Sequence, residues 1–378
     1  MKSTQAILQT KDMAIERALY VSFELGDKAW KLTICDGQRA PARFTIAAGA
    51  QCAVLQCIAK SKVRCGLPPD APVYSCYEAG RDGWWLHRWL KEQGIHNIVV
   101  DSSSIEVNRR SRRAKSDRLD GDKLLAMLLR YYRGDTRVWS LLQEPSPQAE
   151  DERRLHRELQ RLVRERTAHT NRIRALLVLH NLRPAHVGDR AWLQWWPAHQ
   201  AQLLPQLRWE IERELQRLDL VKQQIHTIEA QRTHELAQQR HPLVSRLIQL
   251  RAIGVCSAWT LVKEVFGWRR FGNRRQLAGS LGLTPTPYSS GDSHVEQGIS
   301  KAGNKRVRAL LVELAWRWLR LQPHSQLSRW FNQRFAHGSK RMRRIGIVAL
   351  ARRLAIALWR FVEHGEIPAD AMLKPISA

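Results

Sequence analysis

The sequence ALYVSFE, residues 18–24, alternates between two kinds of side chain and decides the fold of the first part of the chain. Strongly apolar side chains at positions 19, 21 and 23 alternate with Tyr20, Ser22 and Glu24. A repeat of two is typical of a β-strand whose two faces differ in character. The stretch therefore predicts a strand, with Glu24 near its end on the less apolar face.

The residues that follow predict a meander and then alternating helices and strands. Two more strands are expected at Ala29–Cys35 and Ala42–Ala47, separated by the Asp36-Gly37 turn. Helix, strand, helix and strand are then expected at Ala50–Cys65, Val73–Tyr77, Gly83–Gln93 and Asn97–Val100. This order matches the α/β ribonuclease H-like fold, whose active site gathers carboxylates from strand ends and from one late helix.

A basic run and two acidic residues follow the last of these strands. The run is Arg109-Arg110-Ser111-Arg112-Arg113-Ala114-Lys115, which is either a solvated loop or a grip on a backbone phosphate. Asp117 and Asp120 open an expected helix at a spacing that puts both carboxylates on one face. They repel each other unless a cation such as Mg²⁺ neutralises them. The alternative is that Asp is favoured in a first turn by the helix dipole.

Two long amphipathic helices are expected in the middle of the chain. The first runs over Pro147–His180 and the second from Leu207 to about Gln239, each with an apolar stripe. Such a pair is typical of a coiled coil or an antiparallel helical hairpin. We expect residues 147–240 to form a coiled-coil arm for dimerisation, between a domain over residues 1–146 and a mainly helical domain over residues 241–378.

A serine-rich stretch in the last third precedes a cluster of cations. Residues 284–291 are expected to form a polar loop in which Ser290 lies on a sharp turn before Gly291. A serine beside a helix start and several cations suits attack on a phosphate. The alternative is a loop whose serines only donate hydrogen bonds to a phosphate. The polar and basic residues at this helix start are Lys301, Asn304, Lys305, Arg306 and Arg308.

Composition limits the partners of the chain. Its 378 residues carry a formal net charge of +27, and 44% of them are hydrophobic, so we expect a folded protein that binds a polyanion such as nucleic acid. No apolar run is long enough to span a membrane, and the six cysteines show no metal-binding spacing. We therefore expect a soluble cytoplasmic protein with reduced, buried thiols.

Three motifs, taken in order, carry a resemblance to one family. They are Tyr77-Glu78-Ala79-Gly80, then Lys115-Ser116-Asp117-Arg118-Leu119-Asp120, then Ser290-Gly291 followed by Gly298-Ile299-Ser300-Lys301-Ala302-Gly303-Asn304. Over nearly its whole length the chain resembles the DEDD-type transposases of bacterial insertion sequences, whose members are known as bridge-RNA-guided recombinases. The resemblance implies a ribonuclease H-like domain, a coiled-coil linker and a C-terminal transposase domain with a catalytic serine.

The resemblance also implies which residues do the chemistry. The catalytic and magnesium-binding carboxylates fall on Glu24, Glu78, Asp117 and Asp120. Glu24 departs from the family, which usually has aspartate there, and Asp27 is its rival. The serine falls on Ser290, with Ser289 as the alternative.

The implied reaction is attack by Ser290 on DNA, with Mg²⁺ as cofactor and a covalent phosphoserine link as intermediate. The implied partners are DNA, a non-coding guide RNA and further copies of the chain, as dimers that assemble into a tetramer near the bacterial nucleoid. Two other classes stay open: a resolvase-like nuclease that uses metal-activated water, and a non-catalytic nucleic-acid-binding protein.

Overall fold

The computed structural model describes residues 17–80, 82–105, 117–290 and 293–375. The chain divides into two compact units, residues 1–144 and 145–378. The expected boundary at residue 146 lies next to this division, whereas the expected boundary at residue 240 falls inside the second unit and stays a prediction. Among the described residues, no helix is long and apolar enough to cross a membrane.

The first unit is built on a five-stranded mixed sheet. Its strand order is β3-β2-β1-β4-β5, in which β1, β2 and β3 are antiparallel neighbours and β4 and β5 run parallel to β1. All five strands were predicted from the sequence. They are β1 (Leu19–Leu25), β2 (Ala29–Cys35), β3 (Ala42–Ala47), β4 (Val73–Glu78) and β5 (His96–Val100).

Helices pack on both faces of this sheet, and the alternation in β1 shows why. Leu19, Val21 and Phe23 share one apolar cluster with α1 (Gln51–Cys65) and α2 (Trp85–Glu92). Tyr20 points to the other face, where it joins a second cluster with α3 (Asp117–Tyr132). Both faces of β1 are therefore covered, and the polar side chains at positions 22 and 24 lie on the α3 face.

Glu144 ends the first unit beside two cations and a histidine. Its carboxylate lies 3.2 Å from His87 Nε2, 3.2 Å from Arg88 Nε and 3.0 Å from Lys91 Nζ. All three partners come from α2. The last residue of the first unit is thus bound to one of the helices that cover its sheet.

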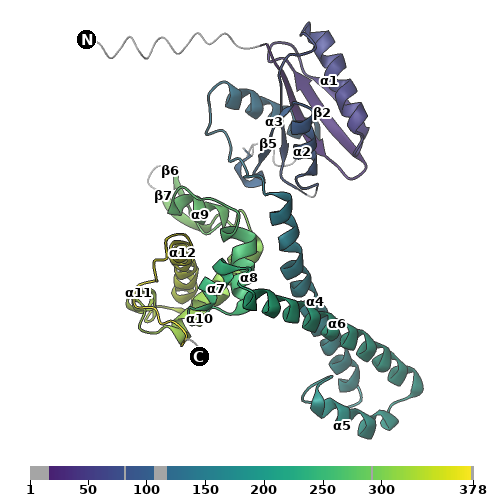
Figure 1. Ribbon diagram of the computed structural model, residues 1–378, viewed down its shortest axis with the longest axis vertical. Coiled ribbons are helices and arrows are strands. Elements are labelled where there is room, and N and C mark those ends of the chain that lie inside the picture. The colour runs from purple at the N-terminus through teal and green to yellow at the C-terminus, as the bar shows by residue number, and fades with distance from the viewer. Residues whose placement is uncertain (1–16, 81, 106–116, 291–292, 376–378) are drawn as a thin grey trace. The chain divides into compact units, whose positions relative to one another are not determined.

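The second unit begins with a helical hairpin. The helices α4 (Pro147–Val178) and α6 (Pro205–Ala237) lie side by side, and the short helices α5 (Arg190–His199) and η3 (Gln200–Gln202) connect them at the far end (Figure 1). The apolar stripes of the two helices face each other within one chain, and Leu218 and Ile211 are fully buried there. Of the two arrangements that the pattern allowed, the structure has the antiparallel hairpin. Dimerisation through this arm stays a prediction.

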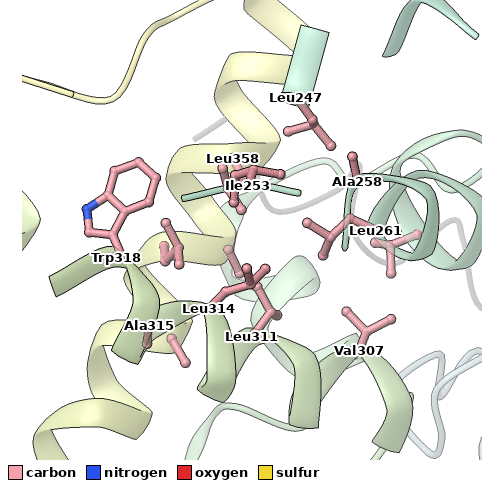
Figure 2. Close-up of a cluster of buried hydrophobic side chains, with 14 of the residues drawn as sticks. Leu247, Ile253, Ala258, Leu261, Val307, Leu311, Leu314, Ala315, Trp318 and Leu358 are labelled. Atoms are coloured by element: carbon pink, nitrogen blue, oxygen red, sulfur yellow. The ribbon is translucent and has the colours of Figure 1, made fainter. Parts of the chain in front are cut away.

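The rest of the second unit is a helical domain around one apolar core. Figure 2 shows Leu311, Leu314 and Trp318 from α10 meeting Leu358 from α12 and Leu247 and Leu261 from neighbouring helices. Its elements are α7 (Pro242–Ile248), α8 (Val255–Leu261), the π-helical turn η4 (Val262–Phe266), α9 (Arg274–Ser280), β6 (Pro285–Ser290), β7 (Ser293–Ile299), α10 (Lys305–Leu321), α11 (Gln326–Phe335) and α12 (Lys340–His364).

Two expectations for local structure are wrong. The stretch expected to be a polar loop forms the first strand of the β6–β7 ribbon, in which Ser290 pairs with Ser293. Pro285 and Pro287 did not prevent a strand, because proline is tolerated where a strand has an open edge, and both strands of a two-stranded ribbon have one. Cys52 and Cys256 are exposed, so the expectation that all cysteines are buried fails for these two.

The hairpin arm gives a first prediction. Leu218→Ala should lower the free energy of unfolding by about 2–5 kcal/mol, because it leaves a cavity where a fully buried side chain packed. Leu220, two residues away on the same helix, is 55% exposed, so Leu220→Ala should change stability by less than about 0.5 kcal/mol. Urea unfolding followed by far-ultraviolet circular dichroism measures both. Equal effects of the two substitutions would contradict the packing of this hairpin.

Candidate functional site

Two of the predicted carboxylates lie next to each other at one edge of the sheet. In the parallel pair β1–β4, Phe23 is opposite Tyr77, so the next residues along the two strands are Glu24 and Glu78. Glu78 is opposite Val100 at the end of β5, and Val100 belongs to the cluster on the α3 face. Both glutamates therefore project to the α3 face where the parallel strands end.

The start of α3 lies against the same face. The buried Ser22 hydroxyl donates a 2.8 Å hydrogen bond to the Gly121 carbonyl oxygen. A Cβ atom on Gly121 would lie 2.7 Å from Thr33 Oγ1, so only glycine allows α3 to approach β1 and β2 this closely. The helix runs in the opposite direction to β1: the ring of Tyr132 at the end of α3 lies 6.2 Å, centroid to centroid, from the ring of Tyr20 near the start of β1. The first turn of α3, with Asp120, is thus aimed at the end of β1 where Glu24 lies.

The structure brings these backbone positions together but does not show a finished metal site. Among the described side chains, no three of His, Cys, Asp and Glu are grouped as metal ligands. Asp117 is the first residue of α3, but its side chain lies outside the described residues, as do Arg109, Arg110, Arg112, Arg113 and Lys115. Asp27 is exposed in the turn after β1. An all-carboxylate set still fits Mg²⁺, which prefers oxygen ligands.

The second group of predicted residues lies at the base of the β6–β7 ribbon. Backbone hydrogen bonds join Ser300 to Thr284, Lys301 to Gly282 and Asn304 to Ser280 at 2.9, 3.2 and 3.2 Å. Gly303 has φ +75°, and a Cβ atom there would overlap the Ser280 carbonyl oxygen, so this position requires glycine. The ribbon that ends at Ser290 therefore has a closely fitted base. The side chains of Ser289 and Ser290 lie outside the described residues.

Three of the residues expected to bind nucleic acid at this base already have partners within the chain. Asn304 Oδ1 accepts hydrogen bonds from the backbone N–H groups of Arg306 and Val307, which makes Asn304 the N-cap of α10. Arg308 Nη1 donates to the carbonyl oxygens of Leu281 and Ala302 at 3.0 and 2.9 Å. By contrast, Lys301 and Lys305 are exposed.

The third partnered residue, Arg306, binds a buried carboxylate that sequence reasoning missed. Glu264 has a side chain only 1% exposed and lies in the π-helical turn η4. It accepts hydrogen bonds from Arg306 Nη1 at 3.1 Å and Asn304 Nδ2 at 3.0 Å, both at the start of α10. It also accepts hydrogen bonds from two residues of α4. His156 Nε2 donates at 2.8 Å, and Arg157 Nε and Nη2 donate at 2.7 and 2.8 Å.

The partners of Glu264 decide its charge. Burial alone raises the pKa of a carboxyl, but the hydrogen bonds from Arg157 and His156 and the charge of Arg157 outweigh it and hold the pKa of Glu264 well below its ordinary value of 4.5. Burial lowers the pKa of His156 despite the bond to Glu264. A neutral His156 ring then donates from Nε2, because a carboxylate only accepts. Glu264 is therefore a buried anion whose ligands come from two separate helices.

One signal in the sequence could have indicated Glu264. It lies with Lys263 inside the otherwise apolar stretch WTLVKEVF, residues 259–266, and two adjacent charges in a buried segment need partners. Lys263 is also buried, and its Nζ lies 2.7 Å from Glu152 Oε2 on α4. The segment thus binds α4 through both of its charges.

Comparison with known proteins identifies the family. A family model described as "Transposase IS116/IS110/IS902 family" matches residues 244–329, which include Glu264, Ser290 and Asn304. A protein of Sinorhizobium fredii that is named as a transposase, y4rJ, is 39% identical over 376 residues, which cover 94% of this chain and 95% of that protein. The chain belongs to the IS116/IS110/IS902 family of transposases.

Two further relatives in the same group are more distant. The transposase for insertion sequence element IS1328 of Yersinia enterocolitica is 31% identical over 229 residues, which cover 59% of this chain and 66% of that protein. The transposase for insertion sequence element IS1111A of Coxiella burnetii is 28% identical over 210 residues, which cover 54% of this chain and 57% of that protein.

The Glu264 cluster gives a prediction about acid stability. Because the folded pKa is depressed, the stabilisation is fully present above about pH 4.5 and is lost as the pH falls toward the folded pKa. Glu264→Gln should lower the free energy of unfolding at pH 7 by about 3 kcal/mol, since it removes the buried anion that binds the guanidinium groups of Arg157 and Arg306. It should also flatten the fall in stability below pH 4.5. Denaturant unfolding at several pH values measures both effects.

Glu158 provides the matched control, because it is an exposed acid on α4 two residues from His156. Glu158→Gln should leave both the stability at pH 7 and the acid profile close to those of the unaltered protein. If the stability of Glu264→Gln falls below pH 4.5 as steeply as that of the unaltered protein, the Glu264 carboxylate is not the cause of the fall.

Proposed function

We propose that this transposase cuts and rejoins DNA strands with Ser290 as nucleophile and with Mg²⁺ held by Glu24, Glu78, Asp117 and Asp120. The observation that carries the proposal is the register of β1 and β4, together with the position of α3. It brings three of the four carboxylates to one edge of the sheet. The family match places the chain among transposases but does not identify its chemical groups.

The sheet supports a ribonuclease H-like assignment for the first unit. Its order β3-β2-β1-β4-β5, with three antiparallel strands followed by two parallel ones, is the arrangement that we expect of that fold. The proposal is further supported by the positions of Glu24 near the end of β1, Glu78 at the end of β4 and Asp120 in the first turn of α3, because such a fold gathers its carboxylates from strand ends and a late helix. The departure at Glu24 keeps the charge and lengthens the side chain by one methylene group.

The carboxylates would hold Mg²⁺ through their oxygen atoms. When bound, Mg²⁺ polarises a phosphate and stabilises negative charge on its oxygens. The protein must hold several negatively charged side chains close together at one edge of the sheet. The close fit of Gly121 against Thr33 holds the start of α3 at this edge. Without a cation, these carboxylates repel one another across the ends of two adjacent strands.

The serine would form the covalent link. Ser290 Oγ attacks the phosphorus, the phosphorus–oxygen bond to one DNA hydroxyl breaks, and the serine proton leaves as the departing hydroxyl takes one up. In the rejoining step, an incoming DNA hydroxyl attacks the phosphoserine and releases Ser290. The carboxylates belong to the first unit and Ser290 to the second, so the proposed reaction would need groups from both units at one phosphate, supplied either by one chain or by two copies of it.

The cations at the ribbon base would divide into two roles. Lys301 and Lys305 are exposed and can meet the phosphates of DNA. Arg306, Arg308 and Asn304 bind within the chain, and they would act by shaping the loop that carries the lysines. We also propose a non-coding guide RNA and assembly of dimers into a tetramer, for which the net charge of +27 provides the electrostatic attraction to nucleic acid.

The carboxylate set can be tested by one substitution and a control. Asp120→Asn should lower the rate of DNA strand cleavage by about 100-fold or more, since the site loses several kcal/mol of charge stabilisation. Asp70 is exposed at the far end of the same unit, before β4, and Asp70→Asn should cleave normally. Cleavage of labelled DNA in Mg²⁺ measures both, and binding should be intact in each. Full activity in Asp120→Asn would remove Asp120 from the site.

The serine nucleophile has its own test. Ser290→Ala should bind DNA normally but form no covalent adduct, which denaturing gels of labelled DNA detect as a slowly migrating band. Ser289→Ala is the matched control and should form the adduct. An adduct that is lost only in Ser289→Ala would move the nucleophile by one residue. Cleavage without an adduct in every protein would identify a nuclease that uses water, with Ser290 as a phosphate ligand.

A further inference from the structure

The helices α11 and α12 carry a strong excess of positive charge that the proposed chemistry does not use. Every charged side chain between Glu313 and Glu363 is Lys or Arg. In the part of the chain that the structure describes, no carboxylate lies within ion-pair distance of Lys340, Arg341, Arg343 or Arg344. None of the described carboxylates therefore balances these four cations.

The start of α12 projects into solvent. All residues from His337 to Ile345 are exposed, whereas from Gly346 onward the same helix buries one side in the core of the domain. The exposed residues of α12 span more than one helical turn, so their side chains point in every direction around its axis. Met342 and Ile345, which are 43% and 47% exposed, interrupt the cations with apolar surface. This segment is a free-standing helix end and is not one face of a packed helix.

A second pair of cations is gathered near the same helices. The guanidinium carbon of Arg353 lies 4.0 Å from the centroid of the Trp330 ring, and that of Arg334 lies 5.9 Å from it. Burial and the charge of Arg334 together lower the pKa of Arg353. Among the described residues, no carboxylate forms an ion pair with either arginine. An anion such as phosphate would therefore stabilise these two cations at the Trp330 ring.

The connection between the two helices is short and fixed. Residues 336–339 separate α11 from α12, and Ser339 caps α12 by accepting a hydrogen bond from the Met342 backbone N–H. Phe335 packs directly on Gly346, where even a methyl group would overlap its ring. A turn of about four residues that contains glycine is of the length that joins the two helices of a helix-turn-helix unit.

We propose that α11 and α12 form a helix-turn-helix unit whose exposed start of α12 enters the major groove of duplex DNA. Lys340, Arg341, Arg343 and Arg344 would meet base edges and phosphates in the groove, as the first residues of a recognition helix do. Arg334 and Arg353 would bind a backbone phosphate beside it. This inference rests on the proposed function only for the identity of the ligand as DNA.

The shape of the segment favours DNA over RNA. The major groove of B-form DNA is about 12 Å wide and admits an α-helix, whose diameter with side chains is about 10–12 Å. The major groove of an RNA duplex is deep and narrow and excludes one. A helix end can enter the DNA major groove only if it is exposed on all sides. A protein that merely lies across the phosphate backbone needs no more than a flat basic face.

The test compares two double variants of the full-length chain. Arg343→Ala with Arg344→Ala removes two cations from the exposed helix start, and alanine preserves the helix. Arg154→Ala with Arg161→Ala removes two arginines that are 80% and 77% exposed and already paired with Asp151 and Glu165. Fluorescence anisotropy with a short labelled DNA duplex of mixed sequence, measured over a series of salt concentrations, gives the affinity and its salt dependence.

The first variant should bind the DNA duplex at least about tenfold more weakly, and the slope of log affinity against log salt should shrink by about 2. The control variant should change the slope by less than about 1. Methylation of guanine N7, which lies in the major groove, should weaken binding of the unaltered protein but not of the first variant. Unchanged affinity and slope in a variant that keeps its circular dichroism spectrum would overturn the proposal.

A parallel titration with an RNA duplex of the same sequence tests the choice of ligand. A loss of RNA binding as large as the loss of DNA binding would overturn the assignment to the DNA major groove. The experiment requires no cleavage, so its outcome is separate from that of the proposed chemistry. If the first variant binds DNA more weakly but the unaltered protein forms no serine adduct, this inference stands and Ser290 is not the nucleophile. If the adduct forms but the first variant binds DNA as tightly as the unaltered protein, the nucleophile stands and this inference fails.

Discussion

The buried carboxylate of Glu264 is the interaction on which the second unit depends. Hydrophobic packing alone does not specify how a long hairpin joins a helical domain, because apolar surfaces can slide past one another. A buried anion with ligands from α4 and α10 permits far fewer arrangements, since any shift leaves a charge without a partner. The same ligands fix the cap of α10 and, through it, the base of the serine ribbon. The arm and the ribbon are thus positioned by one group.

In the first unit, backbone geometry positions the acidic residues. Parallel strands β1 and β4 end together, and their register alone brings Glu24 and Glu78 side by side. The third carboxylate, Asp120, comes from a helix, so its position depends on how closely that helix approaches the sheet. The Ser22 hydroxyl and the missing side chain at Gly121 set that approach. Small polar residues next to the acidic ones therefore matter as much to this edge as the acidic residues themselves.

The sequence predicted the sheet well because its strands have a clear repeat of two and each face has its own apolar cluster. It predicted the two long helices for the same reason, from their apolar stripes. It failed at β6, because the prolines and serines of residues 285–290 lack any apolar alternation and favour a loop by composition. It also missed Glu264, whose role depends on partners more than a hundred positions away in the case of His156 and Arg157. Contacts at that separation leave no local pattern to read.

The junction between the two units has a mechanical consequence. Glu144 is bound to α2 through Arg88, Lys91 and His87, and α4 begins at Pro147 with Ser146 as its cap. Pro145 is the one residue between the anchored side chain and the capped helix, and a proline ring fixes its own φ angle. Few backbone torsions are therefore left to vary at this point. The link that joins Glu144 to α4 is therefore a short and stiff piece of backbone, in which a single proline separates an anchored side chain from a helix cap.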